Sequence, residues 1–315
     1  MPHTSLIPQQ FPKYHPEVIW SFLPFIILPN LTIIIAFIAD SKLRLTANYF
    51  VCSLACGDFL VGAVLLPTVL IGPWNSSGYV ILFTYANTMM LTCACAHDRY
   101  VAIKDPLHYQ NRLRMSKVYI ILCVCWLVPI LIAMIPAIWI RGVEDQLLME
   151  NRIFIGVCSL SVLIAVISQI VAYCVIFRIA RGQIKTIRKI PKISTSSYSD
   201  KVKLSRKIHN IMKELMFAKL FAAVAFTFLL FWIPICYINL VDNVFLRPDL
   251  MPMWVQEMSF YCMWFSSMIN PFLYGLFQKA FRKSIFSWLR RFFCSNSTKN
   301  GALMALKRTA KTAAS

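Results

Sequence analysis

A single carboxylate stands in the middle of one of the chain's long apolar stretches. Asp58 lies in the segment Ser-Leu-Ala-Cys-Gly-Asp-Phe-Leu-Val-Gly. A charged side chain at the centre of a bilayer costs ~2.5–3.5 kcal/mol on insertion scales, unless it is neutralised, hydrated or paired with a cation. Polar side chains that could reach Asp58 occur at comparable depths in other apolar stretches: Asn30, Thr88, Ser266, Ser267 and Asn270.

This polar set has two interpretations. In one, its oxygens surround a hydrated sodium ion beside Asp58, which would make sodium an allosteric ligand. In the other, the side chains form a polar cluster that only fixes how the helices pack. Spacing alone favours the packing cluster, and the sodium ion remains the alternative. We expect no other cofactor and no further metal site.

A second constellation of charges lies where apolar stretches end. Asp98, Arg99 and Tyr100 are consecutive, and Glu214 precedes Pro234 by twenty residues. Arginine keeps its charge at any accessible pH, so Arg99 needs a partner or water. If the two helix ends approach, an Arg99–Glu214 pair would form a two-state element that a partner protein could break. The alternative is two charges that snorkel to the interface without a switching role, which spacing favours at least as strongly.

The elements that position these residues are seven long apolar stretches. A bilayer core of ~30 Å needs roughly 20 apolar residues of helix. The sequence predicts helices of about that length over Val18–Asp40, Ala47–Ile71, Gly78–Ile103, Val118–Ile140, Ile153–Ala180, Ile208–Leu240 and Met253–Phe277. The fold class is therefore an all-α membrane protein, a seven-transmembrane helix bundle whose partner is the lipid bilayer.

Composition and charge agree with this class. The 315 residues are 58% hydrophobic and only 14% charged, with a net charge of +19, whereas soluble domains carry about 25% charged residues. Positive charge could indicate nucleic acid, but all except four of the 32 Lys and Arg fall on one side of the predicted spans. The positive-inside rule explains this bias, so we expect no nucleic-acid partner, a cytoplasmic C-terminus and an extracellular N-terminus.

The chain divides into four parts by pattern. Residues 1–17 form a polar extracellular N-terminus, 18–277 the bundle, 278–293 a basic amphipathic helix on the inner membrane surface, and 294–315 a disordered cytoplasmic tail. Cys294 ends the amphipathic helix and is a palmitoylation candidate, with an unmodified cysteine nearly as favoured. Asn75-Ser76-Ser77 fits a glycosylation acceptor in the first outer loop.

Taken in order along the helices, the polar and aromatic residues resemble the rhodopsin-like class (class A) of G-protein-coupled receptors. The similarity runs over nearly the whole chain. The residues that carry it are Asn30; Leu54, Ala55 and Asp58; Asp98, Arg99 and Tyr100; Trp126; Tyr173; Phe228, Trp232 and Pro234; and Asn270, Pro271, Phe272, Leu273 and Tyr274.

The resemblance implies roles for these positions. Asp58 with Asn270 resembles the sodium-binding centre, and Arg99 resembles the residue that pairs with Glu214 at rest and engages the G protein when active. Trp232 resembles the toggle below the ligand pocket. The residues implied in coupling and switching are Asp98, Arg99, Tyr100, Tyr173, Glu214, Asn270, Pro271 and Tyr274. No covalent chemistry is required, so we expect no enzyme.

Three positions depart from the family pattern. Trp74 stands where a cysteine usually joins the second outer loop, which predicts that the usual disulfide is absent. Ala165 replaces the proline of the fifth helix, and Phe231 stands where cysteine is commoner before Trp232.

The resemblance says less about the ligand than about the switch residues. Amine receptors place an aspartate at the position of Ile81, so an amine is disfavoured, and the seventh stretch lacks the lysine of retinal pigments. Asn48-Tyr49-Phe50-Val51 and Asn239 resemble adenosine receptors, and melanocortin receptors share two of the departures. We therefore expect a divergent member nearest to that grouping, with an adenosine-like or small-peptide ligand. The expected pocket residues are Ile81, Tyr85, Trp232, Asn239 and Trp264.

The implied function is transmission of an extracellular ligand signal to a heterotrimeric G protein at the plasma membrane, with arrestin and receptor kinases as further partners. Two alternatives stay open. A transporter or channel would need several ionisable groups along a path, and only Asp58 lies deep. A receptor-like protein without a ligand is the other.

Overall fold

The computed structural model describes residues 16–71, 74–105, 108–139, 144–189, 198–250, 252–277, 280–287 and 290. All regular structure within these ranges is helical. The elements are α1 (Pro16–Ala39), η1 (Ser41–Leu43), α2 (Thr46–Leu60), η2 (Val61–Leu65), α3 (Leu66–Ile71), α4 (Trp74–Lys104), α5 (Tyr109–Arg112), α6 (Met115–Trp139), α7 (Glu144–Lys189), α8 (Tyr198–Asn243), η3 (Pro248–Leu250) and α9 (Met253–Phe277).

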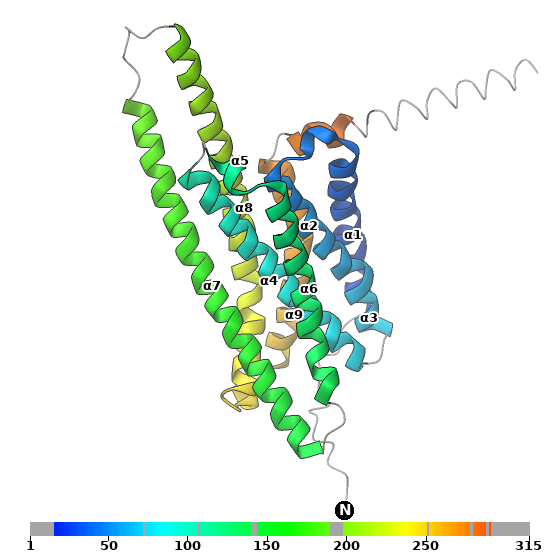
Figure 1. Cartoon of the computed structure of the whole chain (residues 1–315). Coiled ribbons are helices and arrows are strands. Elements are labelled where there is room, and N and C mark those ends of the chain that lie inside the picture. Colours follow the sequence, from blue (N-terminus) through cyan, green and yellow to red (C-terminus); the bar gives the residue numbers. More distant parts are fainter. Residues whose placement is uncertain are drawn as a thin grey trace, which may run out of the picture.

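Seven of these segments form one bundle, and the predicted fold class is confirmed (Figure 1). Six of the described helical segments are long and apolar enough to cross a membrane: those of α1, α2 to α3, α4, α6, α7 and α8. The seventh, α9, is 25 residues long and packs against α1, α2 and α8. Helix α4 lies at the centre, because it contacts α2, α6, α7 and α8. Residues on α4 are therefore placed to meet several helices at once.

The inner end of the bundle is the one that carries η1, α5 and residues 280–287; the outer end is the opposite one. Figure 1 draws the inner end at the top, and α7 and α8 project there beyond the other helices. The sequence predicted that α7 ends near Ala180 and α8 begins near Ile208, which is wrong. Helix α7 continues to Lys189 and α8 begins at Tyr198. The added turns are rich in Lys, Arg and Gln, which favour helix in water as well, whereas hydropathy marks only the membrane boundary.

Residues 280–287 form part of the predicted amphipathic helix. Phe281 is fully buried against the core that α1, α2 and α4 share, and Ile285 packs beside it. Arg282, Lys283 and Phe286 are exposed. One face of this short helix therefore closes the inner end of the bundle.

The second span is interrupted where the sequence predicted a single helix. Its hydrogen bonding changes to the π pattern over Val61–Leu65 before α3 resumes. Such single-turn bulges widen a helix and re-aim the side chains beyond it. Gly62 lies in this bulge, and a methyl group at its Cα would come 2.7 Å from Ile27 Cγ1 and 3.0 Å from Ile26 Cγ2. The bulge therefore lets α1 approach closely only because residue 62 has no side chain.

We expect Gly62→Ala to destabilise the bundle by about 1–3 kcal/mol, the usual cost of overpacking a tight core. The measurement is the thermal denaturation midpoint of the purified protein in detergent. Gly78→Ala is the control, because a methyl group there meets nothing within 4 Å and alanine favours helix over glycine. Equal midpoints for the two variants would contradict the close approach of α1.

Candidate functional site

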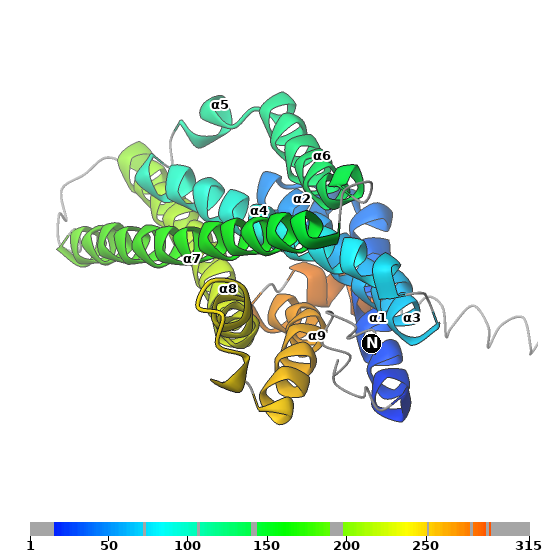
Figure 2. The same cartoon turned by 90° about the horizontal axis from the view of Figure 1, so that it is seen from below.

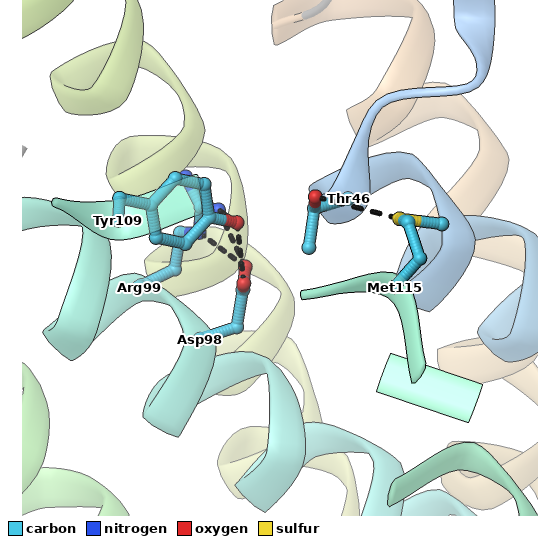
Figure 3. Close-up of polar contacts among 5 residues, drawn as sticks. All are labelled: Thr46, Asp98, Arg99, Tyr109 and Met115. Carbon is cyan, nitrogen blue, oxygen red and sulfur yellow. Dashed lines mark hydrogen bonds and ion pairs between the residues drawn. The ribbon is translucent and has the colours of Figure 1, made fainter. Parts of the chain in front are cut away.

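The last turns of α4 hold a buried ion pair at the inner end. Asp98 and Arg99 are both fully buried. The Arg99 Nε donates to Asp98 Oδ2 over 2.9 Å, and Nη2 of the same guanidinium also contacts this oxygen. Figure 3 shows the two side chains turned toward one another. Because neighbouring residues on a helix do not normally face each other, both side chains must bend to one side to make this contact.

A tyrosine from the following segment completes this pair. The Tyr109 hydroxyl donates to Asp98 Oδ1 over 2.6 Å and accepts from Arg99 Nη2 over 3.2 Å (Figure 3). Its ring also lies 5.8 Å from the guanidinium carbon. Tyr109 begins the short helix α5, so the turn after α4 brings it back over the ion pair. We call Asp98, Arg99 and Tyr109 the inner triad.

Sequence reasoning did not assign a role to Tyr109. The available signal in the sequence was Pro106, because proline disfavours helix at the residue before it, and α4 ends just upstream, at Lys104. Asp105 frames this turn on the solvent side, where His108 Nδ1 lies 3.0 Å and Arg112 Nη2 3.3 Å from its carboxylate oxygens. The hydrogen bond to His108, with added attraction from Arg112, holds the pKa of Asp105 below its usual range. The turn is thus fixed by charges outside and by the inner triad inside.

A separate contact joins the helices beside the triad. Figure 3 shows Thr46 at the start of α2 facing Met115 at the start of α6, and Thr46 Oγ1 lies 3.9 Å from Met115 Sδ. Sulfur is a weak acceptor, so this contact positions the two helix starts without contributing charge.

The other predicted switch residues are placed as follows. Tyr100 accepts a hydrogen bond from Lys104 Nζ over 3.0 Å, and half-buried Tyr173 packs against Ile103, Ile176 and Ala218. Glu214 lies on α8 and Tyr274 on α9, but their side chains lie outside the described part of the chain. The Arg99–Glu214 pair therefore remains a prediction.

The polar core is organised around Asp58. Asn270 Nδ2 donates to Asp58 Oδ2 over 2.8 Å, and the Ser267 hydroxyl is a second hydrogen-bond partner of this carboxylate. Asn30 Nδ2 donates to the Ser267 carbonyl over 3.1 Å, which joins α1 to α9. Pro271, next to Asn270, is buried as well. These contacts bring together residues from three helices, as the sequence pattern predicted.

Other predicted members of the polar core also lie in the protein interior. The Asn30 Oδ1 atom is buried without a hydrogen-bond partner among the described residues, and Thr88 is nearly buried on α4. The Ser266 hydroxyl has other hydrogen-bond partners. It donates to the Met263 carbonyl and accepts from Trp232 Nε1 over 3.3 Å.

The predicted ligand-pocket residues gather toward the outer end. Tyr85, Trp232 and Trp264 are buried in one apolar cluster, with Ile81 packed against it. The Tyr85 and Trp232 rings lie 4.6 Å apart, and the Tyr85 hydroxyl lies 3.6 Å from Cys236 Sγ. Asn239 is half-buried further along α8.

A buried amide, which sequence reasoning missed, links α7 to α4. Gln169 Nε2 donates to Thr92 Oγ1 over 2.8 Å, and Cys93 Sγ lies 3.4 Å away. The bridge lies one turn from Ala165, where the usual proline is replaced. Asn87 Nδ2 on α4 donates to the Cys125 carbonyl of α6 over 2.9 Å. Trp126 Nε1 of α6 donates in turn to Ser53 Oγ of α2 over 2.9 Å. Polar contacts therefore join α4 to both α7 and α6.

Three covalent features were predicted from the sequence: the absence of the usual disulfide, glycosylation at Asn75 and palmitoylation at Cys294. All ten cysteines from Cys52 to Cys262 are free thiols, so no disulfide exists within the described chain. Asn75 belongs to the first turn of α4, but its side chain and that of Trp74 lie outside the described residues, as does all of Cys294. Glycosylation and palmitoylation remain predictions.

The buried charged residues at the end of the central helix, with the Asp58–Asn270 contact, form the pattern by which the chain resembled a receptor class. Residues 29–274 match the family described as 7 transmembrane receptor (rhodopsin family). The chain belongs to this family. The predicted recognition as a rhodopsin-like receptor is thus confirmed, and the match runs from within α1 to within α9.

Curated relatives of this rhodopsin-family receptor include trace amine-associated receptor 6 from Pan troglodytes and from Homo sapiens. Each is 29% identical over 284 aligned positions, which cover 81% of this chain and 79% of the relative. Trace amine-associated receptor 7d from Rattus norvegicus is 29% identical over 283 positions. The closer grouping with adenosine or melanocortin receptors remains a prediction beside these similarities.

Proposed function

We propose that this receptor transmits binding of an extracellular ligand to a heterotrimeric G protein at the plasma membrane. The single observation that carries the proposal is the inner triad. A fully buried arginine at the end of the central helix is held by a carboxylate and a loop hydroxyl, both of which can release it. A buried ion pair is costly to form, and it is weak support for stability alone. A switching role accounts for keeping it.

The proposed mechanism is a population shift. In the resting state the inner triad keeps Arg99 folded against α4. A ligand that binds the outer cluster more tightly in a second state would favour that state, in which α8 moves outward and Arg99 becomes available to the G protein. Tyr173 on α7 and Tyr274 on α9 are proposed to support the open form. The same open face would serve arrestin and receptor kinases.

The test is receptor-catalysed GDP–GTP exchange on purified G proteins, with the receptor in nanodiscs. Exchange above the rate of the G protein alone supports the proposal. Receptor-free rates with every G-protein subtype and ligand class would favour the receptor-like protein without signalling. Ion flux from receptor-containing liposomes would instead favour the transporter or channel.

For the polar core we propose that a sodium ion binds at Asp58 and favours the resting state. The Asp58 carboxylate would hold the ion, with Ser267, Thr88 and the unpartnered Asn30 Oδ1 as neutral oxygen neighbours. The ion supplies a positive charge that offsets the buried carboxylate. The alternative, a polar packing cluster, is supported by the direct Asp58–Asn270 hydrogen bond, so the two must be separated by experiment.

We expect 150 mM sodium to lower basal exchange of the wild-type receptor several-fold relative to 150 mM choline. Asp58→Asn should lose most of this sodium dependence, because the neutral amide no longer attracts a cation. Thermal denaturation with and without sodium gives a second readout that needs no G protein. Full sodium dependence in the Asp58→Asn variant would leave only the packing role.

For the ligand we propose an uncharged aromatic compound, of the adenosine type, or a short peptide. The support is the outer cluster, where Ile81 lies in place of an acid and Tyr85 and Trp232 form an aromatic floor that suits a planar ring. The names of the relatives associate those receptors with trace amines. A screen that sets nucleosides and short peptides beside amines decides between them: activation by amines alone would contradict an uncharged ligand.

A further inference from the structure

The short loop that joins α8 to α9 is apolar although it lies beyond the end of the apolar span. That span ends at Asp242 and α9 begins at Met253. The side chains of Phe245, Leu246 and Trp254 are 64%, 56% and 66% exposed. Large apolar groups gathered at one surface of a protein normally mark an interaction site.

Several hydrogen bonds hold the loop in one conformation, so its apolar side chains are exposed on an ordered segment. The Arg247 guanidinium makes two hydrogen bonds to the Asp249 carboxylate, over 2.8 and 2.7 Å. These contacts lower the pKa of Asp249 and raise that of Arg247. Tyr237 on α8 donates its hydroxyl to the Leu250 carbonyl over 3.2 Å. The backbone N–H of Arg247 closes the turn on the Val241 carbonyl over 3.0 Å.

The turn also holds one residue in an unfavourable conformation. Leu246 has a φ of 53°, which is in the left-handed region that costs an L-residue with a Cβ roughly 1–2 kcal/mol. Glycine or asparagine would be cheaper here. The strain directs a large apolar side chain outward, and such strain generally persists where the outward side chain has a use.

The apolar side chains of the loop continue the outward-facing stripes of the two helices. On α8, Phe226, Leu230, Ile233 and Tyr237 are exposed, and Val244 follows Phe226 by about five helical turns, which puts both on one face. On α9, Trp254 has the same relation to exposed Phe272. These stripes lie on spans that face hydrocarbon, so the loop borders the same medium.

The position of the loop in the bundle also indicates contact with the bilayer. Figure 2, seen from the outer end, shows the segment between α8 and α9 at the rim of the bundle and not across its centre. A loop at the rim faces the surrounding bilayer. Tyr237 and Trp254 flank it, and these two residue types are enriched where membrane meets water.

We propose that the α8–α9 loop is a membrane anchor whose Phe245, Leu246, Leu250 and Trp254 side chains insert into the interfacial region of the outer leaflet. The Arg247–Asp249 pair stays at the polar headgroups, where an ion pair needs no burial. The anchor ties the outer ends of α8 and α9 to the lipid at a fixed depth. This interaction is independent of the proposed coupling to G proteins.

The experiment places a fluorescent unnatural amino acid at position 245 of the full-length receptor, one copy per nanodisc. Quenching is measured with lipids that carry a nitroxide at the headgroup, at acyl carbon 5 or at acyl carbon 12, and with aqueous iodide. Position 230 on α8 is the deep control. Position 205 is the water control, because it precedes the apolar span by thirteen residues, about 20 Å of helix.

The anchor predicts that probes at 245 are quenched at least twofold more by headgroup or carbon-5 lipids than by carbon-12 lipids or iodide. Position 230 should respond most to carbon 12, and position 205 to iodide. If position 245 behaves like 205, the loop lies in water and the proposal fails. Shielding of 245 from all quenchers would show that protein covers the patch, which also overturns it.

Discussion

Replacing Arg99 with alanine is expected to reduce receptor-catalysed nucleotide exchange at least a hundredfold, to the rate of the G protein alone. The variant loses the only permanent positive charge of the inner triad, and with it the group proposed to enter the G-protein interface. The measurement is the exchange assay in nanodiscs at equal amounts of folded receptor. An exchange rate within a factor of two of wild type would refute this role.

The same substitution has a structural cost that must be separated from the functional one. It leaves the fully buried Asp98 carboxylate with the Tyr109 hydroxyl but without its cation, and breaking a buried pair this way costs about 3–5 kcal/mol. The double variant Asp98→Asn/Arg99→Ala removes the uncompensated charge. We expect it to regain thermal stability while exchange stays absent. Recovery of both would mean that Arg99 only neutralises Asp98.

The bundle was predictable because a bilayer imposes a length and a composition on every span. The stretch Met253–Phe277 was predicted with the bounds that α9 has, although Gln256 and Glu257 interrupt its apolar pattern. What hydropathy could not predict is helix beyond the membrane. The inner turns of α7 and α8 are polar and basic, and the sequence pattern there also fits a linker.

Some contacts of the candidate site were likewise predictable from the sequence, and others were not. Asp58 and Asn270 were predicted to meet because each is a polar group in an apolar helix, and such groups find one another when water is absent. Tyr109 was not, because its contact with Arg99 depends on the path of the short connection from α4 to α5. Gln169 was missed because an amide on a span could equally face a cavity. Its bond to Thr92 depends on the rotation of α7 about its own axis.

Tyr109 offers the sharpest test of the resting state, because phenylalanine keeps its ring and removes only its hydroxyl. That oxygen donates to Asp98 Oδ1 over 2.6 Å and accepts from Arg99 Nη2 over 3.2 Å. Hydrogen bonds to charged groups contribute about 1.5–3 kcal/mol each. If only one such contribution distinguishes the resting from the open state, its loss shifts the equilibrium about tenfold or more, since 1.4 kcal/mol is a factor of ten.

We therefore expect Tyr109→Phe to raise basal exchange about tenfold, and Asp98→Asn to raise it at least as much, because the amide no longer binds the guanidinium as an ion. Tyr79→Phe, which removes a hydroxyl at the outer end of the same helix, should leave the basal rate unchanged. The two triad changes should also be less than additive when combined, since both release Arg99. Fully additive increases would mean that the hydroxyl and the carboxylate act on different elements, and the inner triad would not be one switch.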